Sequence, residues 1–168
     1  VEFGNKNYEI NKLVKGILTI NKRTVYIVAA NAEKTYDAQP YPYEKFTAIV
    51  DGTRCEGLAS GESLADLGTF EFSGPAIKAT DWIANGYEIY ANCIPDESGI
   101  AKNYNIVCDN TNAGKLIINK REVQVTVNAM NPHTYDGNAY KDFSVTIVNA
   151  IDKADENKIR GDIAYRID

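Results

Sequence analysis

Few residues in this chain of 168 are suited to catalysis. His133 is the single histidine; it follows Pro132 in a turn, and no serine or cysteine stands near it in a catalytic motif. A histidine that acts as a general base, or that activates a nucleophile, needs neighbouring side chains to orient it, and the sequence around this loop histidine offers none in a catalytic motif. We therefore expect no enzymatic activity and no catalytic residue.

Acidic side chains are the next candidates, as ligands for a cation. Asp37 and Asp136 each follow a Thr-Tyr pair, but the alternating Asp or Asn spacing of a calcium loop is absent. We expect each carboxylate to bond to turn backbone while the preceding tyrosine packs inward. The cluster of Asp152, Asp155 and Glu156 is typical of a solvated loop. The sequence thus predicts no metal and no cofactor.

The three cysteines are Cys55, Cys93 and Cys108, and no pair has the C-x-x-C spacing of a zinc or redox site. Cys93 and Cys108 flank the loop 94–107 on strands that could form a hairpin, where a disulfide is geometrically feasible. We predict a bridge between these two, with Cys55 left as a buried thiol. Pairing of Cys55 with either of them stays open.

Aromatic residues could form a sugar-binding face, because flat rings stack well on sugars. Trp82, Tyr87 and Tyr90 all lie in the region 76–100. The competing interpretation is ordinary β-sheet packing, in which a tyrosine keeps one edge in water. We favour packing and keep these three residues as a candidate ligand face.

The elements that hold these residues follow from an internal repeat. Residues 16–25 return 98 positions later as residues 114–123, with the shared pattern Gly-x-Leu-x-Ile-Asn-Lys-Arg-x-Val. The matches keep their order over separations of 96, 98 and 99 residues, as small loop insertions between paired strands would produce. The flanking matches are Asn7-Tyr8-Glu9-Ile10 with Asn103-Tyr104-Asn105-Ile106, and Thr35-Tyr36-Asp37 with Thr134-Tyr135-Asp136.

Period-two alternation dominates the chain. Val25, Ile27 and Ala29 alternate with their neighbours, as do the valines of 123–127, and helical periodicity is scarce. The charged stretch 150–160 is interpreted as a polar loop or a single turn. We expect an all-β fold of tandem small antiparallel β-sandwich modules of the immunoglobulin-like kind. Further strands are predicted over 45–50, 69–73, 86–94, 103–107, 114–118, 143–148 and 163–167.

The succession of Asn-Tyr-x-Ile, Gly-x-Leu-x-Ile, Lys-Arg, a Val-alternating strand and Thr-Tyr-Asp resembles the MBG family of bacterial immunoglobulin-like modules. The resemblance covers both copies, and therefore nearly the whole chain. It implies tandem modules in large bacterial surface proteins and adhesins, usually as parts of stalks. The first copy departs from the pattern in length, because the region 76–100 looks like an insertion, which leaves room for a specialised role there.

The Lys-Arg pairs, Lys22-Arg23 and Lys120-Arg121, mark the junctions between units. The first unit, residues 22–119, is complete, whereas the second unit, residues 120–168, stops before an Asn-Tyr-x-Ile or Gly-x-Leu-x-Ile pair. Residues 1–21 contain that pair without a unit of their own. We hypothesise that a copy of residues 1–21 from a neighbouring repeat or subunit completes the second unit. Joining Asp168 to Val1 preserves the alternation through Ile163, Tyr165, Ile167, Val1 and Phe3.

Three arrangements would give these boundaries: a covalent repeat of 168 residues, separate subunits that donate N-terminal strands, or a fragment with ragged ends. The first two produce a fibre, because a head-to-tail contact does not close unless its rotation happens to. We therefore expect a structural repeat of an extracellular stalk or fibre on a bacterial cell surface, with identical repeats or subunits as partners.

The alternative is an adhesin module that recognises a glycan or host protein through the Trp82 region or exposed tyrosines. Nucleic acid is a poor candidate partner, because the net charge is −5 and the basic residues are scattered. Membrane insertion is excluded for this segment, since no apolar run reaches about 18 residues.

Overall fold

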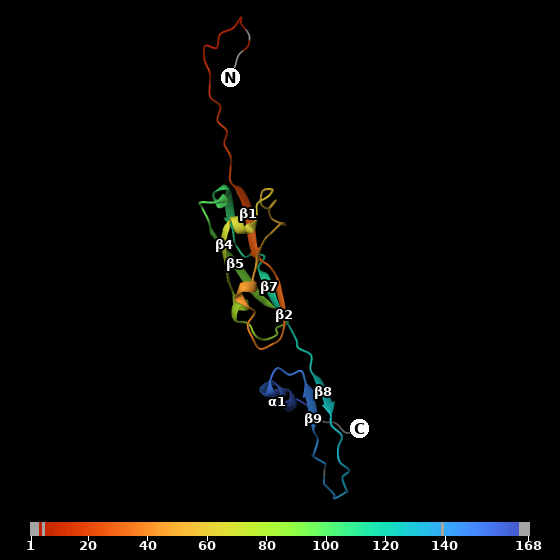
Figure 1. The fold of residues 1–168 in the computed structure, drawn as a ribbon. Helices are drawn as coiled ribbons and strands as arrows, with labels where there is room; N and C mark the ends of the chain where they lie inside the picture. Colours follow the sequence, from red (N-terminus) through yellow and green to blue (C-terminus); the bar gives the residue numbers. More distant parts are fainter. Residues whose placement is uncertain (1–3, 5, 139, 165–168) are drawn as a thin grey trace.

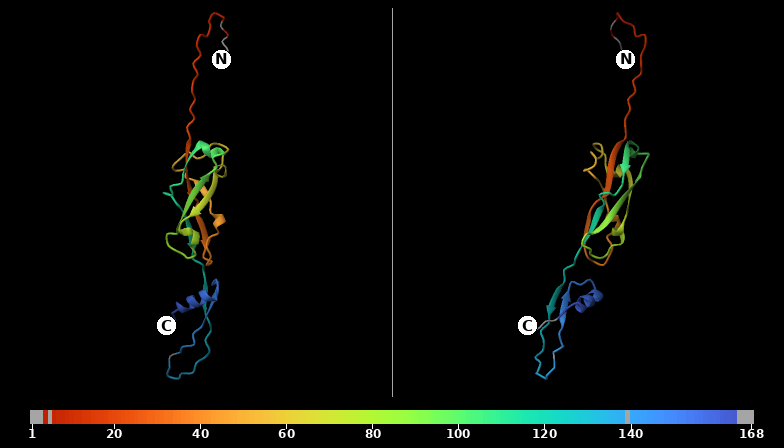
Figure 2. Two further views of the ribbon diagram at one scale, coloured as in Figure 1. Left: turned by 90° about the vertical axis from the view of Figure 1, so that its left-hand side faces the viewer. Right: turned by 180° about the vertical axis from the view of Figure 1, so that it is seen from behind.

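The structure, a computed structural model, describes residues 4, 6–138 and 140–164. The molecule is elongated, with the N-terminal segment projecting from one end of the first unit and the second unit at the other end (Figures 1 and 2). The strands are β1 (Arg23–Ala29), β2 (Ala32–Thr35), β3 (Ala48–Val50), β4 (Gly68–Ser73), β5 (Tyr87–Pro95), β6 (Tyr104–Val107), β7 (Gly114–Asn119), β8 (Gln124–Val127) and β9 (Val145–Val148). The helix is α1 (Lys153–Gly161), and 3-10 turns cover Tyr43–Lys45, Leu64–Asp66, Pro75–Lys78 and Ile100–Asn103.

The described chain is built mainly from strands in several sheets, so the all-β prediction is confirmed at that level. The first unit has a three-stranded sheet, β3-β1-β6, and a four-stranded sheet, β2-β7-β5-β4. Side chains from both sheets enter the same apolar clusters: Val25 and Tyr104 of one sheet meet Phe70 and Cys93 of the other. The core of the first unit therefore lies between the two sheets.

Two of the strand pairings in the first unit are parallel. β1 runs beside β6 with Val25 opposite Ile106, and β2 runs beside β7 with Ala32 opposite Leu116. The prediction of purely antiparallel sheets was wrong here, because both stretches of chain pass from the three-stranded to the four-stranded sheet in the same direction. Consequently the first and last strands of the unit point the same way, and the chain enters at one end and leaves at the other.

The predicted insertion over 76–100 was also wrong. Its second half is β5, which pairs with β4 on one side and β7 on the other, and Ile89 and Ala91 within it are buried. The interpretation as an insertion rested on a departure in length from the family pattern, and length alone does not show whether a stretch of chain enters the core. β5 is instead a central strand of the first unit's core.

The hairpin of β8 and β9 repeats the pairing of β1 with β3. Val125 lies opposite Ile147, just as Ile27 lies opposite Val50, after shifts of 98 and 97 residues. The next backbone hydrogen bond is kept as well: Asn128 N to Ser144 O at 3.0 Å corresponds to Ala30 N to Thr47 O at 2.8 Å. The second unit therefore builds the opening part of the first unit's fold in the same register.

The polar-loop interpretation of 150–160 was wrong, because that stretch holds helix α1. Asp152 caps it by accepting a hydrogen bond from Asp155 N at 2.9 Å. Glu156 accepts hydrogen bonds from Lys153 and Arg160, three and four residues away, a spacing that favours a helix. The predicted strand over 163–167 lies largely outside the described residues.

Gly114 stands where β7 crosses β1. A Cβ at this position would lie 2.4 Å from Ala29 O and 2.7 Å from Ala30 O, closer than real Cβ atoms approach backbone oxygen. Only glycine lets the two backbones come this close. The glycine of the repeated Gly-x-Leu-x-Ile pattern is thus required by the parallel packing of last strand against first.

We predict that Gly114→Ala destabilises the first unit by about 1–3 kcal/mol, the usual cost of overpacking. Urea unfolding followed by the fluorescence of Trp82, the single tryptophan, measures this. Gly52→Ala is the matched control, because its Cβ would meet nothing within 4 Å. Equal shifts in both variants would contradict a specific crossing contact.

Candidate assembly interface

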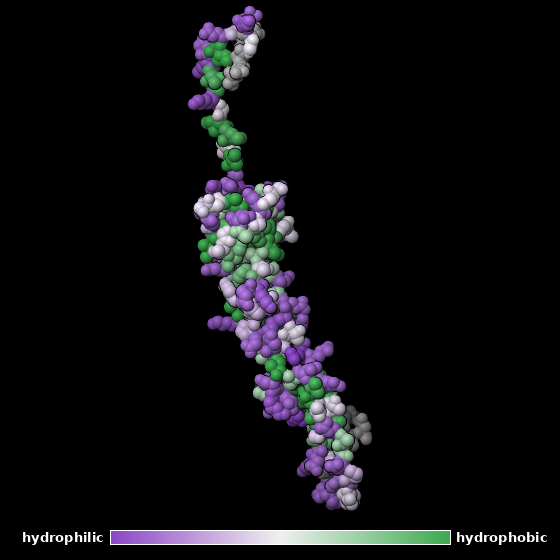
Figure 3. Space-filling model, viewed as in Figure 1, coloured by the Kyte–Doolittle hydropathy of each residue, from purple (hydrophilic) through white to green (hydrophobic). Residues whose placement is uncertain are grey.

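The N-terminal segment, residues 6–21, carries the repeat pattern of β6 and β7 but forms no strand. Leu18 and Ile20 are 84% and 85% exposed, whereas their equivalents Leu116 and Ile118 are 0% and 1% exposed. Hydrophobic surface accordingly runs along this segment outside the first unit (Figure 3). The segment has the side chains of a last strand without the first strand that would bury them.

The second unit has the opposite deficiency. Val123 and Val125 are 37% and 42% exposed, whereas Val25 and Ile27, at the equivalent places, are both 0% exposed. Among the described residues no strand lies on the edge of β8 that corresponds to the edge of β1 occupied by β6. The described part of the second unit thus has a first strand without last strands that cover it.

An apolar hollow of about 310 Å³ marks the uncovered core of the second unit. Tyr140 and Phe143 meet there with ring centroids 5.3 Å apart, as the equivalent Tyr41 and Phe46 do at 5.0 Å in the first unit. The first-unit pair packs against the cluster that holds Leu116 and Ile118. The hollow is therefore the place that such a leucine and isoleucine fill. It is lined by Met130, Asn131, His133, Tyr140 and Phe143.

His133 belongs to this apolar wall. Its ring lies edge-on to Tyr140 at 5.4 Å between centroids, and its Nε2 is 3.5 Å from Asp136 Oδ1. Residues 131–134 correspond to β2 yet form no strand, because the partner of β2 is β7 and the described second unit has no equivalent of β7. His133 therefore lines the apolar hollow of the second unit.

The two Thr-Tyr-Asp motifs show the same contrast. Asp37 accepts a hydrogen bond from Gln39 N and Asp136 one from Asn138 N, both at 2.9 Å, so the predicted turn contacts are confirmed. Tyr36 packs against the core as expected, but Tyr135 is 91% exposed. Inward packing of Tyr135 was a wrong prediction, because the described second unit offers nothing to cover it. Across the described residues, no three His, Cys, Asp or Glu side chains gather as a metal site.

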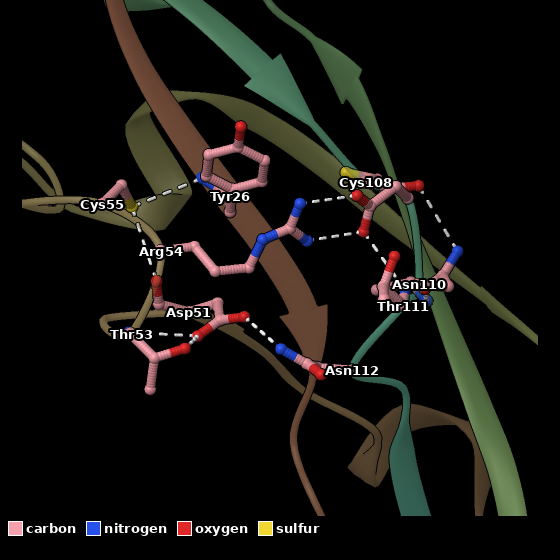
Figure 4. A network of polar contacts seen from close by, with 11 residues as sticks. Tyr26, Asp51, Thr53, Arg54, Cys55, Cys108, Asn110, Thr111 and Asn112 are labelled. Carbon is pink, nitrogen blue, oxygen red and sulfur yellow. Dashed lines mark hydrogen bonds and ion pairs between the residues drawn. The ribbon is translucent and has the colours of Figure 1, made fainter.

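A polar network fastens the last strands of the first unit to its first strands (Figure 4). Arg54, in the loop after β3, donates two hydrogen bonds of 2.8 Å to Asp109, in the loop between β6 and β7, and stacks on Tyr26 of β1 at 3.9 Å. Asp51, which directly follows β3, accepts a hydrogen bond from its neighbour Thr53 and another from Asn112, in the β6–β7 loop. The network therefore joins the β6–β7 loop to the loop that follows β3.

The cysteines lie beside this network as free thiols, so the predicted bridge between Cys93 and Cys108 is not formed in the structure. The hairpin expectation was wrong, because β5 and β6 belong to different sheets. Burial, and next the neighbouring Cys108, raise the pKa of Cys93. Cys55 accepts a hydrogen bond from Tyr26 N at 3.5 Å, and all three cysteines pack against one apolar cluster.

The candidate ligand face of Trp82, Tyr87 and Tyr90 is not a single surface. Tyr87 and Tyr90 are three positions apart on β5, so their side chains point to opposite faces of the sheet. Tyr87 packs against the core, and Tyr90 donates a hydrogen bond of 2.5 Å to Glu88. The Trp82 ring lies under Lys120, whose Nζ is 4.1 Å from the ring centroid. Trp82 therefore contacts the junction between the units.

The junction residues make matching contacts. Arg23 donates through Nε to Gly57 O, and Arg121 donates through Nε to Asn149 O, both at 2.7 Å. Each arginine thereby holds the chain that follows the second strand of its own hairpin, β3 in the first unit and β9 in the second. Lys22 is exposed, while Lys120 carries the contact with Trp82. A further contact, from Tyr36 OH to Asp155 at 3.4 Å, joins the first unit to α1.

No protein-family model matches the chain, and no curated protein or solved structure matches it either. Among the described residues, no helix is both long and apolar enough to span a membrane.

Sequence reasoning located the repeat but missed several residues that carry its function. Gly16 and Gly114 repeat at one place of the pattern, and such a repeated glycine is the available signal of a close backbone approach. The contacts of Arg54 with Asp109, and of Tyr36 with Asp155, join residues 55 and 119 positions apart. Nothing in the local pattern pointed to either contact.

We predict that Asp109→Asn lowers the urea midpoint of the first unit at neutral pH. Hydrogen bonds from Arg54 hold the pKa of Asp109 far below its ordinary value of 3.8. The ionised carboxylate therefore stabilises the fold above the unfolded-state pKa, and this contribution is lost as the pH falls through the folded-state pKa. The gap between wild type and variant should accordingly narrow below about pH 4. Asp142→Asn, at an exposed site in the second unit, is the control, and a gap that stays constant with pH would refute the role of the ion pair.

Proposed function

We propose that the chain is a structural repeat of an extracellular stalk or fibre on a bacterial cell surface. In this proposal each unit is an immunoglobulin-like β-sandwich module, as the resemblance to the MBG family implies, and a neighbouring copy completes the second one. Copies follow one another head to tail, joined covalently or by strand complementation. The chain then acts mechanically, by setting the length and stiffness of the array.

The observation that supports this function best is the complementary pair of ends. The N-terminal segment exposes the apolar side chains of last strands, and the second unit, at the far end of the molecule, exposes the apolar face of a first strand (Figure 1). Such ends favour an open series of copies, because a heterologous contact extends rather than closes. The contacts of Lys120 with Trp82 and of Tyr36 with Asp155 would stiffen the junction inside each copy.

A role in adhesion through the Trp82 region gains less support. Lys120 covers one face of the Trp82 ring, and the two tyrosines of β5 lie on opposite faces of the sheet. The structural role is therefore the one proposed function.

We predict that chains with one, two and three copies, joined from Asp168 to Val1, lengthen by a constant increment per copy. A stiff array extends linearly, because each unit contacts mainly its neighbours. Small-angle X-ray scattering measures the maximum dimension. Growth with the square root of copy number, as for a flexible coil, would rule out the mechanical role.

The cellular location has its own test. Antibodies raised against the chain should label intact cells of the bacterium that makes it. Labelling that requires permeabilised cells would contradict an extracellular stalk.

A further inference from the structure

We infer that residues 8–21 of a second copy of this chain complete the second unit, in the register that β6 and β7 adopt in the first unit. The inference rests on the proposed head-to-tail array and names its contact. The first unit is the template, because its β6 and β7 have the same sequence pattern as the segment and are paired within the same chain.

The first step of the contact is parallel pairing along residues 121–124, the stretch that leads into β8. In the first unit Arg23 lies opposite Tyr104 and Val25 opposite Ile106. The repeat offsets of 98 and 96 residues place Tyr8 of the second copy opposite Arg121, and Ile10 opposite Val123. This strand lies along residues 121–124, on the same side as the edge of β8 that no described strand occupies. Ile10, which is 44% exposed in the single copy, then covers the exposed valines of the first strand.

The second step fills the hollow. In the first unit Ala32 lies opposite Leu116 and Lys34 opposite Ile118. The corresponding pairs put Leu18 of the second copy opposite Asn131, and Ile20 opposite His133. Their side chains then lie against Tyr140 and Phe143, as Leu116 and Ile118 lie in the cluster with Phe46 and Tyr41. With a partner on its edge, the stretch 131–134 gains the hydrogen-bonding neighbour that β2 has in β7.

Gly16 is the third element. It is the equivalent of Gly114, which needs to be glycine because a side chain would strike the carbonyl oxygens of Ala29 and Ala30. In the single copy nothing lies within 4 Å of a Cβ built on Gly16. The structure of one chain thus gives no reason for a glycine at this position. Insertion of Gly16 of the second copy beside Val127 and Asn128 of the receiving copy does give one.

The arrangement predicts which exposed apolar residues matter. Leu18 corresponds to buried Leu116, whereas Ile17, which is 94% exposed, corresponds to exposed Lys115. Non-specific association of apolar side chains would make the two equivalent. Register-specific insertion buries Leu18 and leaves Ile17 on the outside.

Sedimentation velocity of the full chain across a range of concentrations tests the inference. Wild type should form progressively longer species. Leu18→Ala and Gly16→Ala should each weaken assembly by about a hundredfold, the loss expected for a core leucine or a blocked crossing. Ile17→Ala and Gly4→Ala are the matched controls and should assemble as wild type does.

A charge swap tests the register itself. The pairing of Thr24 with Asn105 corresponds to Glu122 beside Glu9 of the second copy, two like charges on neighbouring strands. Glu9→Lys should therefore tighten assembly by about threefold, the size of a cross-strand charge pair. A slip of one residue would put Glu9 beside Arg121 or Val123, and Glu9→Lys would then weaken assembly or leave it unchanged.

Failure of this inference is distinguishable from failure of the proposed function. A chain that never self-associates, or one in which Leu18→Ala and Ile17→Ala act alike, overturns the strand insertion while linear growth of covalent arrays can still support a stalk. Arrays that do not lengthen linearly overturn the stalk, even where Leu18→Ala alone weakens association between separate chains.

Discussion

The parallel pairing of last strand with first strand is the constraint on which the rest of the structure depends. In the first unit β6 lies along β1 and β7 along β2, and Gly114 lets the backbones cross. Because these strands run the same way, the chain passes through the unit from one end to the other. A fold closed in this manner passes its chain directly to a following unit along the same axis.

The second unit shows what the first strands achieve without the last ones. The hairpin of β8 and β9 keeps the register of β1 and β3, so local sequence and hairpin pairing are sufficient for that part. The equivalent of β2 does not form a strand, Tyr135 lies in solvent, and the valines at 123 and 125 are partly exposed. The hairpin therefore forms without the last strands, but burial of the core requires them. The Arg54–Asp109 ion pair fastens those strands in the first unit, whereas Val148 stands at the place of Asp51 in the second, and the described second unit has no counterpart of the network.

The sequence predicted the strands well because alternation of apolar residues reports burial directly. β4 and β7 begin within a residue of their predicted starts, and the arginines of the two repeated Lys-Arg pairs make matching contacts. Pairing partners were harder, since alternation does not say which neighbour a strand takes or in which direction. The antiparallel expectation and the Cys93–Cys108 hairpin failed for this reason. Length relative to the family pattern does not report burial either, so β5 looked like an insertion. Helix α1 was missed because capping by Asp152 and side-chain pairs, and not an apolar stripe, support it.

Amide hydrogen exchange of the full chain, compared between dilute and concentrated solution, tests the central claim most directly. The account predicts that residues 8–11 and 16–21 gain protection together with 121–134 as concentration rises, while β1 to β7 stay unchanged. Simultaneous protection of these separate stretches is expected because they form one paired sheet and one core. Protection that stays low in all of them at every concentration, or that rises in the N-terminal segment alone, would contradict the completion of the second unit by a second copy.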